Sequence, residues 1–148
     1  MTRAIAILIV AFGAALMAEQ QGPASPVFTA QQATEGKIAY AKNCASCHMP
    51  DLSGNNEIPP LAGKAFMDTW GARSTKDLFD YMSAAMPYGG PSLDTDTYLQ
   101  VAAYVLQSNG AAAGMEALSA STVASIVRLA AAHETPTAVP ASPDHEKK

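Results

Sequence analysis

Cysteine and charge are both scarce in this chain of 148 residues, which contains two cysteines and only 15% charged residues. A structural zinc site needs about four ligands. There is no third cysteine, and His133 and His145 lie far along the chain, so such a site is excluded. Nine basic residues against thirteen acidic ones give a formal net charge of −4. Nucleic-acid binding requires clustered positive charge, so no nucleic-acid partner is expected.

Long hydrophobic runs are lacking except at the N-terminus, where residues 4–18 carry no charge and follow Arg3. Small residues up to Ala18 offer a cleavage site, and this arrangement is typical of a secretory signal peptide over residues 1–18. The run is shorter than the roughly 20 residues that span a bilayer; a buried first helix and an uncleaved anchor are the alternatives. We therefore expect export to the periplasm and no membrane span after cleavage.

Patterns typical of strands are also lacking, which predicts an all-α fold. Apolar residues recur at helical spacing in four segments. Thr29 with Gln32, and Ser74 with Asp77, form capping pairs at two of the helix starts, and the Asn-Gly pair at 109–110 is typical of a helix end. The expected helices span 30–42, 75–85, 95–108 and 122–132, and a short helix at 64–70 is a further option.

A long loop separates the first two of these helices. Residues 49–73 have little regular structure, and a loop of this length is uncommon in a small domain, so we expect a bound group to order it. Residues 111–133, which follow the last long helix, are expected either to pack on the preceding helices or to dock a partner. The predicted organisation is a signal peptide at 1–18, a flexible lead-in at 19–29, a main domain at 30–110, an extension with a short amphipathic helix at 111–133 and a disordered tail at 134–148.

Both cysteines lie in one six-residue stretch, 43–48, which reads NCASCH. Thioredoxin-type Cys-x-x-Cys sites place a strand before the pair and a helix after it, whereas here a helix precedes and a loop follows. Cys-x-x-Cys-His is the pattern of covalent haem attachment. Two thiols at this spacing can each form a thioether with one haem vinyl group, and the next residue directs its imidazole at the iron. We therefore expect one haem c bound through Cys44, Cys47 and His48; a haem-free disulfide module is the alternative.

The motif belongs to a wider pattern along residues 30–110. Its other parts are Gly36 and Tyr40 before the motif, Pro-Leu-Ala-Gly at 60–63, Met86–Pro87, and the helix from Tyr98 to Leu106. With these parts in this order the chain resembles the class I c-type cytochromes. The resemblance implies a small helical shell around one haem, with N- and C-terminal helices that cross. Gly36 suits the crossing because it lacks a side chain, and Val101 and Tyr104 are its expected contacts.

Haem iron has two axial positions, and His48 is expected to fill one of them. The candidates for the other are Met49, Met67, Met82, Met86, Met115, His133 and His145. Met86 is favoured because a proline ends the helix directly after it and because similar cytochromes carry Met-Pro at this place. Met82 and Met67 are expected to fill the core, as methionines in helices usually do.

The resemblance also implies roles for residues between the motif and Met86. Pro60 would accept a hydrogen bond from the ring N–H of His48 through its backbone carbonyl, and Leu61 would pack on the haem face. Trp70 and Arg73 would bind the haem propionates, by N–H donation and by charge pairing. A core aromatic and a solvated charge are the alternatives for these two residues.

Two filled axial positions leave the iron no site for a substrate, so we expect an electron-transfer protein rather than an enzyme. A thioether ligand favours ferrous iron. The expected role is to carry single electrons from a dehydrogenase, for example a quinoprotein, to a terminal oxidase, another cytochrome or a different acceptor of a respiratory chain. The alternatives are a cytochrome subunit of a larger redox enzyme and a peroxidase-like catalyst with an open iron site. The protein is expected to be a monomer or a subunit of a complex.

Overall fold

The structure is a computed structural model that describes residues 24–90 and 92–131. Within these ranges the secondary structure is helical, with no strand and two isolated bridges, Thr29–Gly114 and Ser74–Ser125. The predicted all-α fold is therefore confirmed. The helices are α1 (Ala30–Asn43), α2 (Ala45–His48), α3 (Lys64–Trp70), α4 (Thr75–Ala85), α5 (Thr95–Ser108) and α6 (Ile126–Ala131).

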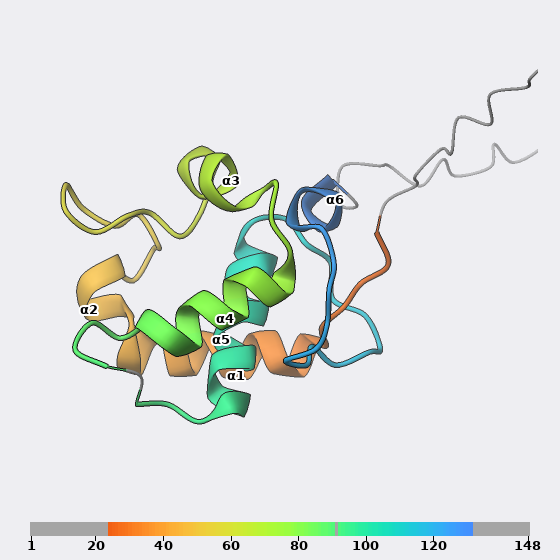
Figure 1. Cartoon of the computed structure of the whole chain (residues 1–148), viewed down its shortest axis with the longest axis horizontal. Helices are drawn as coiled ribbons and strands as arrows, with labels where there is room; N and C mark the ends of the chain where they lie inside the picture. The colour runs from red at the N-terminus through yellow and green to blue at the C-terminus, as the bar shows by residue number, and fades with distance from the viewer. Residues whose placement is uncertain (1–23, 91, 132–148) are drawn as a thin grey trace, which may run out of the picture.

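The crossing of α1 and α5 forms the largest helix–helix interface in the described ranges, with α4 packed against α5 (Figure 1). A Cβ atom on Gly36 would collide with the backbone carbonyl of Gln100 and press on the Cβ of Tyr104. Only glycine allows the two backbones to approach this closely. On the same face the rings of Tyr40 and Tyr104 lie 5.4 Å apart. The expected contact with Tyr104 is present, and the backbone of Gln100 is the nearest partner.

Side chains from just outside the helices satisfy the first amides of α1, α4 and α5. The Thr29 hydroxyl accepts from the Gln32 amide while the Gln32 side chain accepts from the Thr29 amide, so the predicted capping box is confirmed. The second predicted box, at Ser74 and Asp77, is also present. Each cap replaces hydrogen bonds that the first helical turn cannot make internally.

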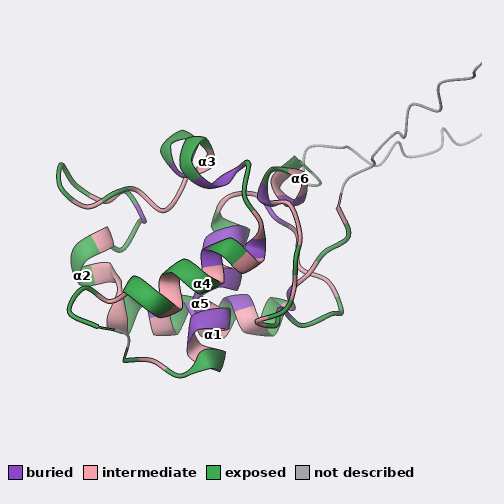
Figure 2. Ribbon diagram, in the orientation of Figure 1, coloured by how far each residue is buried: buried purple, intermediate pink, exposed green. Residues whose placement is uncertain are grey.

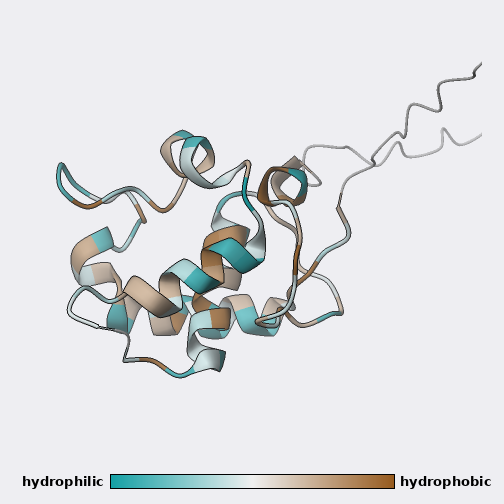
Figure 3. Cartoon of the chain, viewed as in Figure 1, coloured by the Kyte–Doolittle hydropathy of each residue, from teal (hydrophilic) through white to brown (hydrophobic). Residues whose placement is uncertain are grey.

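The core lies between α1, α4 and α5, where Figure 2 shows most of the buried residues of the ribbon. In Figure 3, α4 carries both hydrophobic and hydrophilic residues along its length, and its apolar face packs against α5. Half of α5 is buried, with Tyr98, Leu99, Val101, Ala102, Ala103, Val105 and Leu106 inside. Full burial of one such large apolar side chain stabilises the fold by about 1.5–3 kcal/mol.

The segment after α5 packs on this core instead of standing apart from it. Leu118, Ile126 and Leu129 are buried at 1–3% exposure and join the same cluster as the α1 and α5 residues. Phe28, in the expected flexible lead-in, is fully buried, and its carbonyl accepts a hydrogen bond from the Gly114 amide. The packed unit is therefore wider than the predicted 30–110 domain at both ends, because both flanks contribute core residues.

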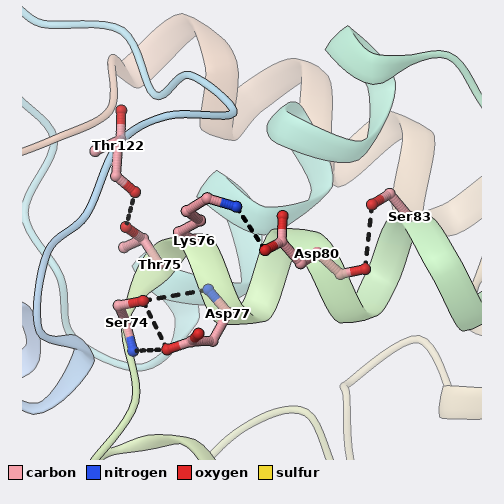
Figure 4. A network of polar contacts seen from close by, with 7 residues as sticks. All are labelled: Ser74, Thr75, Lys76, Asp77, Asp80, Ser83 and Thr122. Carbon is pink, nitrogen blue, oxygen red and sulfur yellow. Dashed lines mark hydrogen bonds and ion pairs between the residues drawn. The ribbon is translucent and has the colours of Figure 1, made fainter.

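Hydrogen bonds join the extension to the start of α4. The buried Thr75 hydroxyl donates to the Thr122 carbonyl at 2.7 Å (Figure 4). The same hydroxyl accepts from the Ala124 amide at 3.1 Å. The Thr75 amide also donates to the Ala124 carbonyl. These bonds hold residues 122–125 outside any helix. The last helix therefore begins at Ile126 and not at 122 as expected.

No helix within residues 24–90 and 92–131 is long and apolar enough to cross a membrane. The predicted signal peptide at 1–18 and the predicted tail at 134–148 lie outside the described residues, as do His133 and His145.

Candidate haem site

A cavity of about 490 Å³ opens between the helices. This volume is within the range of about 300–1,000 Å³ that small-molecule and cofactor sites occupy. Its walls come from the end of α1, from α2, from the 57–61 loop, and from α3, α4 and α5. All eight residues predicted for the site line it: Cys44, Cys47, His48, Pro60, Leu61, Trp70, Arg73 and Met86.

A single turn of helix, α2, positions the two thiols. A turn this short has no periodicity from which the sequence could predict it. The Cys44 carbonyl accepts hydrogen bonds from the amides of Cys47 and His48, at 3.1 and 3.0 Å. Residues three apart on such a turn lie on the same face, and both cysteines are free thiols at the cavity wall. Burial, and then the neighbouring Cys47, raises the pKa of the Cys44 thiol above its ordinary value. The pair is therefore placed to react with two neighbouring groups of one ligand.

His48 is held in one tautomer by its loop. Its Nδ1 atom lies 3.0 Å from the Pro59 carbonyl oxygen. A carbonyl can only accept, so Nδ1 carries the proton in this hydrogen bond. The proton-free Nε2 atom is then the one with a lone pair for a metal, and the carbonyl both orients the ring and strengthens it as a donor.

The prediction that Pro60 accepts this hydrogen bond is wrong, because the acceptor is the carbonyl of Pro59. The Leu61 amide donates to the Leu52 carbonyl at 2.8 Å, which fixes how the proline pair lies between them. Successive carbonyls of an extended proline segment point in different directions, so only one of the two faces the imidazole. Pro60 itself lines the cavity.

The loop that carries Pro59 has its own hydrogen-bonded order. The Gly54 amide donates to the His48 carbonyl. Gly54 has a φ of 62°, and an added Cβ atom would collide with the Ile58 carbonyl oxygen, so a side chain does not fit here. The Asn55 side-chain oxygen accepts from the amides of Glu57 and Ile58. The expectation that a bound group would order this loop is thus incomplete, because internal hydrogen bonds already shape it.

Asn109 closes the far end of the same loop. From the end of α5 its amide group donates to the Leu61 carbonyl at 2.9 Å, and its side-chain oxygen accepts from the Gly63 amide at 2.9 Å. The sequence marked Asn109 only as a helix-end residue. Its second role depends on a contact across 48 residues, which no local pattern signals.

Met86 also lines the cavity. It is the C-cap of α4, its amide donates to the Met82 carbonyl, and its own carbonyl accepts from the Tyr98 hydroxyl at 2.5 Å. Met82 also lines the cavity and packs against the core, whereas Met67 packs against the core away from it. Met115 is 93% exposed. Of the methionine candidates, only Met82 and Met86 therefore reach the cavity that His48 enters.

Trp70 and Arg73 form one wall as a stacked pair. The Arg73 guanidinium lies 5.0 Å from the centre of the Trp70 ring, and the Tyr81 ring packs on Trp70 at 5.3 Å. Arg73 forms no ion pair with the described residues, and the indole N–H of Trp70 donates to none of them. A cation and an N–H donor thus remain available beside the cavity for an anionic group.

Tyr40 and Tyr98, which the sequence indicated only as parts of the family pattern, each donate a hydrogen bond to backbone at or next to a candidate iron ligand. The Tyr40 hydroxyl, on α1, donates to the Met49 carbonyl at 2.6 Å, directly after His48. Burial is the main cause that raises the pKa of Tyr40, so its phenol stays a proton donor. Tyr98, on α5, holds Met86 in the same manner.

Comparison with known proteins identifies the class. The profile of the family described as cytochrome c oxidase, cbb3-type, subunit III matches residues 31–105, about half of the chain. The chain therefore belongs to this family of c-type cytochrome domains, whose members carry covalently bound haem c and transfer electrons. The predicted recognition as a c-type cytochrome is confirmed.

Individual relatives are longer than this chain. The cbb3-type cytochrome c oxidase subunit FixP of Rhizobium meliloti is 33% identical over 93 residues, which cover 61% of this chain and 31% of the relative. The chain thus spans about a third of the length of this curated relative. The crystal structure of the sulfane dehydrogenase SoxCD from Paracoccus pantotrophus is similar with 24% identity and a TM-score of 0.46, over 76% of this chain and 57% of that one.

The residues around the cavity fit haem c. Two free thiols, an imidazole with its lone pair on Nε2 and a thioether are the donor types that c-type haem uses. The remaining walls are largely apolar side chains such as Leu61, Leu78 and Val101, which suit a porphyrin face. No group of three or more His, Cys, Asp and Glu side chains that could hold a metal ion occurs in the described part of the chain.

Proposed function

We propose that this protein is a monohaem c-type cytochrome that carries single electrons between a dehydrogenase and a terminal oxidase or another acceptor. The observation that carries the proposal is the placement of the His48 ring. Its Nδ1–H donates to the Pro59 carbonyl, and the cavity that it lines is also lined by both cysteines and Met86. When bound there, haem supplies a reversible one-electron couple at its iron.

Each cavity residue then has a defined task. The thiols of Cys44 and Cys47 would each hold the haem by adding across one vinyl group, the sulfur to one carbon and the proton to the other, so that no atom would be lost. His48 Nε2 and the Met86 sulfur would be the two protein ligands of the iron. Leu61 packs on the haem face, while Trp70 and Arg73 bind the propionates by N–H donation and charge.

The ligand set favours transfer over catalysis. A thioether raises the reduction potential relative to a second histidine, and burial favours the less charged ferrous state in the same direction. With His48 and Met86 both bound, the iron offers no position to a substrate or peroxide. The N-terminal pattern at residues 1–18 supports export to the periplasm, where a carrier of this kind meets its redox partners.

A second candidate is a cytochrome subunit of a larger redox enzyme. It is favoured by the similarity to FixP, which is itself an oxidase subunit and of which this chain matches about a third. The two candidates differ in what stays bound: a free carrier exchanges its partners, whereas a subunit purifies with them. Isolation of the native protein under mild conditions, with the size of the assembly measured, separates the two.

Mass spectrometry of the exported protein tests the haem assignment. The expected mass is that of the processed polypeptide plus one whole haem, because both thioethers form by addition. The double variant Cys44→Ser/Cys47→Ser should lose this gain, whereas Ser46→Ala, inside the same motif, should keep it. A wild-type mass equal to the bare polypeptide would overturn the proposal.

Absorption spectra of the same samples test the axial pair. The ferric wild type should be low-spin and should show the weak long-wavelength band of methionine-ligated haem, and Met86→Ala should lose that band. Met82→Ala is the matched control, because Met82 also lines the cavity but is expected to be no ligand. Loss of the band in Met82→Ala with retention in Met86→Ala would reassign the ligand.

A further inference from the structure

The loop after α4 is poorly buried: of its described residues at 87–90 and 92, all but Pro87 are exposed. Tyr88, at the centre of this stretch, is 99% exposed. Among the described residues of the loop, the Gly90 amide donates to the Pro87 carbonyl at 3.1 Å. A segment with so little burial is expected to open easily unless something ties it to the rest of the fold.

The hydroxyl of Tyr98 ties both ends of this loop. It donates to the Met86 carbonyl at 2.5 Å and accepts from the Ser92 amide at 3.3 Å. A phenol oxygen has one proton to give and lone pairs with which to accept, so one atom can make both bonds at once. The Met86 carbonyl and the Ser92 amide are therefore both hydrogen-bonded to one oxygen atom, that of the Tyr98 hydroxyl.

Tyr98 is itself held firmly. It is 4% exposed, it lies in the first turn of α5, and Asp94 caps that turn by accepting from the Thr97 amide at 2.8 Å. Through α5 the hydroxyl is connected to the crossing with α1, the most extensive contact between helices in the described ranges. A group is positioned most accurately when it is tied to a rigid element.

We propose that Tyr98 is the positioning residue for the distal iron ligand: its hydroxyl fixes the backbone at Met86 and thereby keeps the methionine sulfur at the iron. This inference rests on the assignment of Met86 as axial ligand. Tyr98 does not bind the iron. Removing its hydroxyl frees the loop, and the bond between methionine and iron then breaks more often.

Competition by imidazole measures how often that bond is broken. Imidazole binds ferric haem only where the sixth ligand has left, so its apparent affinity rises with the open fraction. In the haem-loaded Tyr98→Phe protein we expect imidazole to bind about 2- to 10-fold more tightly than in the wild type, the factor that one net hydrogen bond supplies. We also expect the long-wavelength methionine band to weaken, while the mass still includes one haem.

Tyr104→Phe is the matched control. It removes a hydroxyl from the same helix, and that hydroxyl bonds to none of the described residues. Its imidazole affinity should equal that of the wild type. Equal imidazole affinities in Tyr98→Phe and Tyr104→Phe would overturn the positioning role, even if both variants were less stable.

Hydrogen exchange in the reduced wild type tests the same bond without any substitution. The Ser92 amide should exchange more slowly than the Gly89 amide, which bonds to none of the described residues. Equal rates would overturn the proposal. Met86→Ala separates the two levels of inference: it should bind imidazole at least as tightly as Tyr98→Phe, and wild-type affinity in Met86→Ala would remove the ligand assignment together with this inference.

Discussion

The two sides of the cavity are built in different ways. On the proximal side, both thiols and the imidazole come from one six-residue stretch, and Pro59 and Tyr40, which hold it, lie within 11 residues of it in sequence. On the distal side, Met86 follows His48 by 38 residues (86 minus 48) and is held through Tyr98 on another helix. The proximal side is specified locally, whereas the distal side exists only when α4 and α5 are packed.

This difference predicts how the site should fail. Covalent attachment needs the two thiols of one segment, so it should survive damage to the helix packing. Methionine ligation needs the packed helices, so it should be lost first. The following substitutions test the comparison, beginning with the largest expected effect.

Gly36→Ala should separate the two sides most clearly. The added Cβ would collide with the Gln100 carbonyl at the helix crossing, and overpacking against backbone should cost about 2–4 kcal/mol of unfolding free energy. Chemical denaturation measures this loss, and mass and absorption spectra should show the haem retained but the methionine band weakened. Lys37→Ala, at the exposed neighbouring position, should be close to neutral. A Gly36→Ala protein as stable as the wild type would contradict the close approach of α1 and α5.

Thr75→Val should weaken the fold while leaving both axial ligands in place. It removes the hydroxyl that bonds to Thr122 and Ala124, and the two extension groups left behind lose their partner. The expected cost is about 1–3 kcal/mol of unfolding free energy, measured by thermal or chemical unfolding. Thr34→Val, on the exposed surface of α1, is the matched control. Loss of the methionine band in Thr75→Val would show that the extension supports the distal side, which the comparison above does not predict.

Tyr40→Phe should be the proximal counterpart of Tyr98→Phe. It removes the hydrogen bond to the Met49 carbonyl, at an expected cost of about 0.5–1.5 kcal/mol of unfolding free energy. Because the proximal ligand is expected to be held covalently as well, imidazole affinity and the methionine band should match the wild type. An imidazole affinity raised as much as in Tyr98→Phe would mean that the two tyrosines do not act on separate sides.

Asp77→Asn should have the smallest effect, a loss of stability that is present above about pH 4 and disappears in acid. Hydrogen bonds from the hydroxyl and amide of Ser74 lower the pKa of Asp77 below its ordinary value of 3.8. The carboxylate therefore contributes stability that is present above about pH 4 and is lost as the pH falls through the lower pKa of the folded state. The slope of stability against pH in this acid range should be flatter in Asp77→Asn than in the wild type. Asp68→Asn, at a carboxyl that caps no helix, provides the control for the charge change.

Much of the fold could be predicted because its signals are local. Helical periodicity and the two capping pairs placed α1, α4 and α5 to within a residue at their ends. α2 was missed because a single turn carries no periodicity. α6 was predicted too long because the hydrogen bonds of Thr75 hold residues 122–125 outside the helix.

The site was predictable in part for the same reason. The Cys-x-x-Cys-His motif names three residues of one turn by spacing alone, and the structure places them with Met86 around one cavity. The carbonyl that accepts from His48 was predicted at Pro60, but it belongs to Pro59. The direction of a carbonyl depends on loop geometry, which the local sequence does not specify. Tyr98 and Asn109 were missed as supports because their partners lie on other elements.

The sequence by itself determined the helices, the attachment motif and the family, because each depends on residues within a few positions of one another. Only the tertiary structure decided which carbonyl faces the imidazole, which methionines reach the cavity, and that the segment after α5 belongs to the core. The physical reason is that these features depend on hydrogen bonds and close packing between distant segments, whose free energy appears only when the helices are assembled.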